Sequence, residues 1–147
     1  MKLIPKAEHT CSKCSTRFYA PSLNDFSYGE FLLWSASGEG RYLNAFEDST
    51  YKEVIKLLEE YEKSHILRKS LQEIYGELAC DPDEKNLFFH ITNPPCPKCR
   101  STEMASIGGQ KIEACTVPSV THIFWNALTY EEKKHRLHSL VNCANDQ

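Results

Sequence analysis

The sequence predicts an α+β fold, in which strands and helices occupy separate stretches of the chain. Two observations support this class: β-prone runs flank glycine-rich breaks, and apolar residues recur at helical spacing in other stretches. The 147 residues are 41% hydrophobic and 25% charged, as in an ordinary globular domain. We therefore expect a single domain over residues 1–147 with a buried core, and exclude collagen-like, coiled-coil and disordered chains.

The first expected element is a β-hairpin over residues 28–46. Two β-prone runs, 28–36 and 41–46, lie on either side of Ser37-Gly38-Glu39-Gly40. A short glycine-containing break between such runs is typical of a hairpin turn.

An amphipathic helix is expected to follow from about residue 50. Asp48 and Ser49 are candidate caps, and Thr50 with Glu53 has the spacing of a capping box. One helical face carries the apolar residues Tyr51, Val54, Ile55, Leu58 and Tyr61.

A second helical stretch begins near Ser64 and should end by Asp81-Pro82, because proline restricts the residue before it. Its apolar stripe consists of Ile66, Leu67, Leu71, Ile74 and Leu78. The pattern leaves open whether Ser64-His65 separates two helices.

The last part of the chain predicts three more elements. Residues 86–92 are typical of a buried strand, and residues 101–117 suggest a second hairpin that turns at Gly108-Gly109. A C-terminal helix should begin at Thr129, which forms a capping-box spacing with Glu132. Its apolar stripe is Leu137, Leu140 and Val141.

Two Cys-x-x-Cys pairs provide the clearest chemistry, Cys11 with Cys14 and Cys96 with Cys99. Two intervening residues let one tight turn present both sulfurs to a single ion. Two such turns supply the four-thiolate tetrahedral shell that zinc adopts in closed structural sites. We therefore expect one structural Zn²⁺ bound by these four cysteines.

These residues resemble the zinc-ribbon superfamily, in which two such turns, or knuckles, hold one ion. The resemblance covers residues 11–18 and 95–110. It implies a split zinc ribbon, with the hairpin and helices of residues 28–80 inserted between the knuckles. The sequence departs from the superfamily pattern in two ways. Ser15 and Arg100 stand where the superfamily often has glycine, and 81 residues separate the knuckles. Since structural zinc contributes on the order of 10 kcal/mol, we expect the fold to depend on it.

Other uses of the cysteines agree less well with the sequence. A redox motif at Cys96 and Cys99 would lack the helix that follows such motifs and would leave the first pair unexplained. A nucleobase-deaminase site would need an upstream His-x-Glu or Cys-x-Glu, which does not occur. No other catalytic motif is present, so we expect a protein that is not an enzyme.

The remaining candidate ligands have simpler interpretations. Cys80, Cys115 and Cys143 are expected to be small buried apolar residues. His135 and His138 lie three residues apart on the C-terminal helix, and the sequence leaves open whether they bind a second metal.

The charge distribution favours a protein partner over a nucleic acid. The chain has 17 Lys and Arg against 20 Asp and Glu, with no basic block. Proteins that bind phosphate backbones usually carry such a block. The candidate basic cluster consists of Lys13, Arg17, Lys98 and Arg100, which would also offset the charge of a four-thiolate zinc site.

The expected function is a zinc-stabilised protein-interaction module. It would act as a regulator, an adaptor or an inhibitor, such as an immunity protein that blocks a toxin; the alternative is a nucleic-acid-binding zinc-ribbon protein. Tyr and Trp, which are enriched at binding hot spots, contribute to an aromatic content of 11%. We expect a cytoplasmic location and no membrane partner. The reason is the absence of an apolar run of signal-peptide or membrane-spanning length. In a reducing compartment the seven cysteines, an odd number, are not expected to form a disulfide framework.

Overall fold

The computed structural model describes residues 1–23, 28–84, 86–91 and 93–142, and in them confirms the α+β class. The elements, in chain order, are β1 Lys2–Cys11, β2 Arg17–Pro21, β3 Glu30–Trp34, β4 Gly40–Asn44, α1 Ser49–Glu62, α2 Leu71–Ala79, β5 Met104–Val117, α3 Ile123–Asn126 and α4 Tyr130–Asn142. The strands form two antiparallel sheets, one with the order β2-β1-β5 and one made of β3 and β4.

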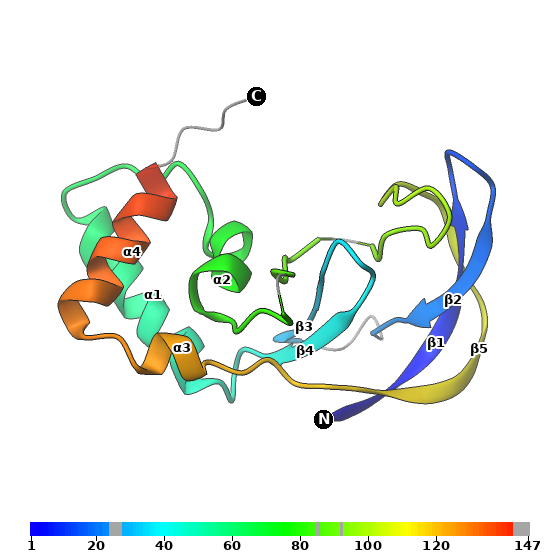
Figure 1. Cartoon of the computed structure of the whole chain (residues 1–147), viewed down its shortest axis with the longest axis horizontal. Helices are drawn as coiled ribbons and strands as arrows, with labels where there is room; N and C mark the ends of the chain where they lie inside the picture. The colour runs from blue at the N-terminus through cyan, green and yellow to red at the C-terminus, as the bar shows by residue number, and fades with distance from the viewer. Residues whose placement is uncertain (24–27, 85, 92, 143–147) are drawn as a thin grey trace.

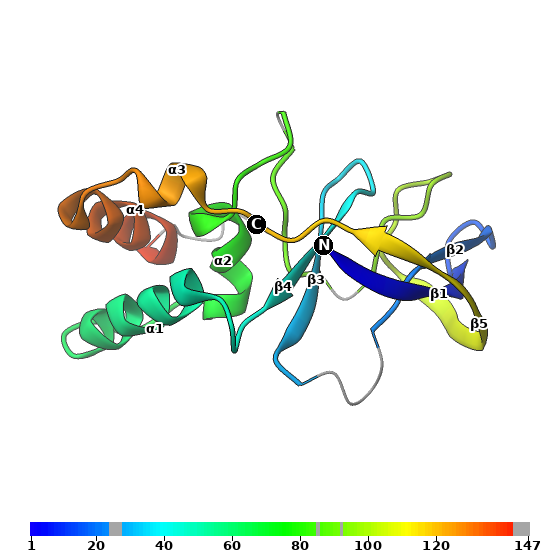
Figure 2. The same cartoon turned by 90° about the horizontal axis from the view of Figure 1, so that it is seen from below.

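The two sheets and the helices follow one another along the length of the molecule (Figure 1). The helices lie at one end, the β2-β1-β5 sheet lies at the other, and the β3-β4 hairpin lies between them (Figure 2). Strand β5 therefore leads the chain back from the sheet end toward α3 and α4.

The expected first hairpin is confirmed as β3 and β4, paired from Glu30 with Asn44 to Trp34 with Gly40. Its turn is closed by Ser35, whose backbone N–H donates to the Glu39 carbonyl (2.9 Å). The Ser35 hydroxyl accepts a bond from the Glu39 N–H (3.2 Å).

Helix α1 is confirmed, but its cap differs from the expected Thr50–Glu53 capping box. The Asp48 carboxylate accepts bonds from the backbone N–H groups of Thr50 (2.9 Å) and Tyr51 (3.2 Å), which makes Asp48 the N-cap. Glu53 instead accepts a bond from the indole N–H of Trp125 (2.8 Å). Glu53 thus contacts α3 and does not form the helix cap that local spacing predicted for it.

Helix α2 begins seven residues later than expected, at Leu71. Ser70 and Glu73 form its capping box, with Glu73 N–H donating to Ser70 Oγ (3.3 Å). Ile66, assigned to the helical stripe, lies in the preceding connection and is 87% exposed. The connection after Glu62 therefore separates two helices, and Ser70 caps the second of them.

The prediction of a strand over the whole of residues 86–92 is wrong. Of the described residues in this stretch, Phe89 forms one antiparallel bridge to Trp34, with N···O distances of 2.8 and 3.0 Å. Phe88 is fully buried while Phe89 is partly exposed, so the alternation typical of a strand is present at this bridge alone. Thr92 lies outside the described residues.

Strand β5 is continuous, so the second hairpin expected at Gly108-Gly109 is wrong. Glu8 of β1 pairs with Gly108, but Lys6 pairs with Ile112, so β5 contains two extra residues between these pairs. Gly108 and Gly109 have φ values of 155° and 79°, which glycine adopts without a steric penalty. The glycines therefore form a bulge inside one strand.

The main core lies among the helices and the β3-β4 hairpin. The expected helical stripes are largely confirmed, and α4 begins with the expected capping box, since Glu132 N–H donates to Thr129 Oγ1 (3.2 Å). Fully buried members include Leu33, Val54, Ile74, Leu78, Phe88, Trp125, Leu137 and Val141. By contrast, the hydrophobic cluster beside the β2-β1-β5 sheet has three buried members among the described residues, Ile4, Tyr42 and Val117, although Ala7, Cys11 and Ala20 of the same sheet are also buried.

Replacing Leu58 by Ala should lower the free energy of unfolding by roughly 2–5 kcal/mol, because the change leaves a cavity in this core. Urea unfolding followed by circular dichroism measures the effect. Glu59→Ala, at an exposed position on the same helix, is the control. A loss below about 1 kcal/mol for Leu58→Ala would contradict the packing of α1.

Candidate metal centre

The two knuckles meet at one end of the β2-β1-β5 sheet. Cys11 is the last residue of β1, and Cys14 lies in the turn to β2. Cys96 and Cys99 lie in a second turn, which leads into β5 at Met104. Because Cys11 pairs with Met104, the β1-β5 ladder brings the second turn beside the first.

Both knuckles have the same backbone hydrogen bonds. In the first, Cys11 N–H donates to the Thr16 carbonyl (2.9 Å) and Ser15 N–H donates to the Cys11 carbonyl (3.0 Å). In the second, Cys96 N–H donates to the carbonyl five residues later and Arg100 N–H donates to the Cys96 carbonyl, both at 2.8 Å. Two turns far apart in the sequence thus adopt one local structure.

The residues that replace the expected glycines retain the glycine conformation. Ser15 has φ 61° and Arg100 has φ 67°, both in the left-handed region. A non-glycine residue is uncommon there and needs support from surrounding interactions. The departure of Ser15 and Arg100 from the superfamily pattern therefore leaves the knuckle geometry unchanged.

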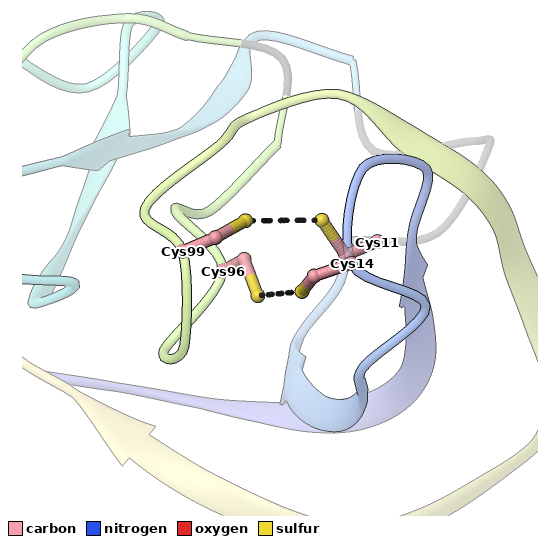
Figure 3. A group of neighbouring side chains, drawn as sticks. All are labelled: Cys11, Cys14, Cys96 and Cys99. Carbon is pink, nitrogen blue, oxygen red and sulfur yellow. Dashed lines mark hydrogen bonds between the residues drawn. The ribbon is translucent and has the colours of Figure 1, made fainter.

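The four sulfurs form a compact cluster (Figure 3). Cys11 Sγ lies 3.5 Å from Cys99 Sγ, and Cys14 Sγ lies 3.6 Å from Cys96 Sγ. All four ligand atoms are within 4.8 Å of one another. Four sulfurs bound tetrahedrally at about 2.3 Å from Zn²⁺ would be about 3.8 Å apart. The cluster can therefore hold one metal ion, and its donor set is the one that structural zinc prefers.

The surroundings of Cys14 and Cys96 favour the thiolate forms that a metal requires, whereas hydrogen bonds with the neighbouring cysteine side chains raise the pKa of Cys99 to about 11. A hydrogen bond with the Thr16 hydroxyl lowers the pKa of Cys14 to about 6. Burial raises the pKa of Cys96, but backbone N–H groups of Cys99 and Lys98 outweigh it, and the net pKa is below its usual range. Lys98 N–H lies 3.4 Å from Cys96 Sγ. Backbone donors of this kind stabilise negative sulfur.

Two residues of the candidate basic cluster have partners in the protein. Lys13 Nζ lies 3.7 Å from a Glu103 carboxylate oxygen. An Arg100 guanidinium N–H donates to the Ser37 carbonyl (3.3 Å), which connects the second knuckle to the β3-β4 turn. All four residues of the candidate basic cluster are nevertheless exposed.

The other candidate ligands do not gather into a second metal centre. Among the residues that the structure describes, the four cysteines are the one group of three or more potential ligands. The ring of His138 packs against Tyr61, at a centroid distance of 4.7 Å. His135 lies in an open groove beside α4, and Cys143 falls outside the described residues.

A polar network at the start of α1 was not anticipated from the sequence. His122 Nε2 donates to Asp48 Oδ2 (2.7 Å), and His122 Nδ1 donates to the Ala79 carbonyl (2.8 Å). The ring therefore has acceptors on both nitrogens, which favours the imidazolium form. The three residues are far apart in the chain, so no local spacing could have identified the network.

The network shifts the pKa values of His122 and Asp48 in the directions that favour a charged pair. Burial lowers the pKa of His122, but Asp48 and the Ala79 carbonyl outweigh it, and the net pKa is raised. Burial raises the pKa of Asp48, but His122 and two backbone N–H groups outweigh it, and the net pKa is lowered. Asp81 and Tyr75 are the other titratable groups near the ring.

Because of these pKa shifts, His122 and Asp48 should contribute to stability in a way that depends on pH. Because the pKa of folded His122 is raised, its contribution is complete below the unfolded value of about 6.5 and is lost as pH rises through the folded value. The contribution of Asp48 is present above about 3.9 and is lost as pH falls through its lowered folded value.

His122→Gln should therefore cost about 2 kcal/mol near pH 5.5 and less near pH 8.5. Urea unfolding at a series of pH values measures the difference between the variant and the unaltered protein. His65→Gln, at an exposed histidine, is the control. A cost that stays constant over this range would show that the ion pair does not form.

Comparison with known proteins finds no matching family model, no matching curated protein and no matching solved structure. The zinc-ribbon resemblance thus rests on the two knuckles alone. Among the described residues, no helix combines the length and apolar character that a membrane crossing requires.

Proposed function

We propose that this protein is a non-catalytic protein-interaction module whose sheet end is stabilised by one structural zinc ion. The metal-binding part of this proposal rests on one observation. The sulfurs of Cys11, Cys14, Cys96 and Cys99 all lie within 4.8 Å of one another. Four thiolates complete a tetrahedral shell and leave no coordination position for an activated water. The metal therefore supports a structural role better than a catalytic one.

Exposed apolar side chains near the end of the helical region support an interaction role. Ile123 and Phe124 of α3 are 77% and 58% exposed, and Tyr130 at the start of α4 is 52% exposed. Exposed apolar and aromatic side chains are common at sites that bind other proteins. We accordingly propose a protein partner, which the module would regulate, inhibit or connect to another component within the cytoplasm.

Nucleic-acid binding is the alternative that an experiment must separate from this function. Its candidate surface is Lys13, Arg17, Lys98 and Arg100 around the knuckles. The Lys13–Glu103 ion pair and the net charge of −3 favour the protein partner. A protein that neutralised several phosphates would also lose affinity steeply as salt rises.

Affinity capture with the zinc-loaded protein tests the proposal. The immobilised chain is incubated with extract of its source cells, with and without nuclease treatment, and bound components are identified by mass spectrometry. We expect a stoichiometric protein partner that survives nuclease treatment. Recovery of nucleic acid that is lost when Lys13, Arg17, Lys98 and Arg100 are changed to Ala would support the alternative instead.

A further inference from the structure

A surface groove of about 610 Å³ lies between α4 and the neighbouring parts of α2 and α3. Phe124, Leu128 and Leu140 supply its apolar lining. Phe124 is more than half exposed, and the other two are partly buried against the main core. In Figure 1 these elements lie at the end of the molecule opposite the β2-β1-β5 sheet. The groove is therefore separate from the candidate metal centre.

Arg136 lines the groove and contacts two of the neighbouring elements. Its guanidinium donates to the carbonyls of Leu78 and Glu77 near the C-terminus of α2, both at 2.9 Å. The same group lies over the Phe124 ring, 5.6 Å from the centroid. Arg136 thus connects α4, α2 and α3, and its donors are engaged with backbone carbonyls instead of carboxylates.

The rim of the groove carries excess negative charge. Glu77, Glu131 and Glu132 line it together with a single guanidinium, that of Arg136. Within the described part of the chain, no cation lies within ion-pair distance of the Glu77 or Glu131 carboxylate. An apolar floor beside unpaired carboxylates is complementary to a segment that presents apolar and basic side chains together.

We propose that this groove binds a cationic amphipathic helix of a partner protein. The helix would place Leu- or Phe-like side chains, spaced i, i+3 or i+4, and i+7, against Phe124, Leu128 and Leu140. Lys or Arg residues beside this stripe would face Glu77 and Glu131. The 13 residues of α4 provide about 20 Å of length, enough for between about three and four turns of a bound helix. The proposal deepens the proposed function and rests on it.

Fluorescence anisotropy with a defined peptide tests the proposal. The probe is a fluorescein-labelled 18-residue peptide of Leu and Lys, arranged so that Leu forms one helical face. A second peptide has Glu in place of every Lys, and a third has the first composition in scrambled order. We expect saturable binding of the first peptide, weakened as salt rises, and no comparable binding of the other two.

Matched variants locate the binding site. Phe124→Ala should weaken binding at least about tenfold, whereas Phe46→Ala, at another exposed phenylalanine, should not. The double change of Glu77 and Glu131 to Gln should weaken binding about fivefold. The control is the double change of Glu59 and Glu62, which are exposed on α1, to Gln.

The results separate this proposal from the proposed function. Equal binding of the Lys and Glu peptides, or affinity unchanged by Phe124→Ala, would overturn the groove proposal. A captured protein partner that is unaffected by Phe124→Ala would also overturn it while leaving the interaction module intact. Because the groove is distant from the knuckles, none of these variants should alter zinc content, which is measured on each preparation.

Discussion

Removing the metal should unfold the β2-β1-β5 end of the protein while the helical core keeps much of its structure. Structural zinc contributes on the order of 10 kcal/mol, which is comparable to the whole stability of about 5–15 kcal/mol expected for a domain. Cys96→Ser should have the same effect, because it removes a fully buried sulfur of the candidate metal centre. Amide NMR spectra should show collapsed dispersion for residues of β1, β2 and β5.

The distribution of the core explains why the effect is expected at this end. The helices share a large buried cluster with the β3-β4 hairpin, whereas the β2-β1-β5 sheet has three buried residues in its described cluster, Ile4, Tyr42 and Val117. A small core requires an additional constraint, such as a metal, to stay folded. The knuckles provide it where β1, β2 and the chain entering β5 meet.

Cys115→Ser is the matched control for Cys96→Ser. Cys115 is partly buried on β5 but is not one of the clustered sulfurs. We expect this variant to retain its metal and the spectrum of the unaltered protein. A metal-free protein or a Cys96→Ser variant with unchanged spectrum and thermal midpoint would contradict the structural role of the site.

Trp125→Ala should lower the free energy of unfolding by roughly 3–5 kcal/mol. The side chain is 1% exposed and fills the core beneath α3. Its indole N–H donates to Glu53 (2.8 Å), which also accepts from Lys133 (2.9 Å). The substitution therefore creates a cavity and removes a bond that holds α3 to α1.

Trp125→Phe separates these two contributions in the same urea experiment. It keeps most of the buried ring volume but removes the indole donor, so we expect a smaller loss of about 1–3 kcal/mol. Metal content should be unchanged in both variants. If Trp125→Ala cost less than about 1 kcal/mol, the packing of α3 against α1 would be contradicted.

Local patterns predicted the parts of the fold that depend on nearby residues. The β3-β4 hairpin, α1 and α4 follow from a turn, a helical stripe and a capping box within a few residues. The wrong predictions concern segments whose structure depends on contacts with distant parts of the chain. Gly108-Gly109 reads as a turn in isolation, but pairing with β1 makes it a bulge.

The candidate site divides in the same way. The four cysteines were identified because the spacing within each pair reflects the geometry of a metal-binding turn, and the structure brings both pairs together. The groove and the Asp48–His122 contact could not be predicted in this way, since their residues come from three elements or connections each. Only the packing of the helices places Phe124 beside Glu77.

X-ray absorption at the zinc edge, combined with elemental analysis of the purified protein, tests the central claim most directly. The expected result is one zinc per chain with four sulfur neighbours at about 2.3 Å. Changing any one of Cys11, Cys14, Cys96 and Cys99 to Ser should reduce the number of sulfur neighbours or abolish binding. A β2-β1-β5 sheet that stays folded without bound metal, or zinc coordinated by nitrogen and oxygen in place of these sulfurs, would contradict the account.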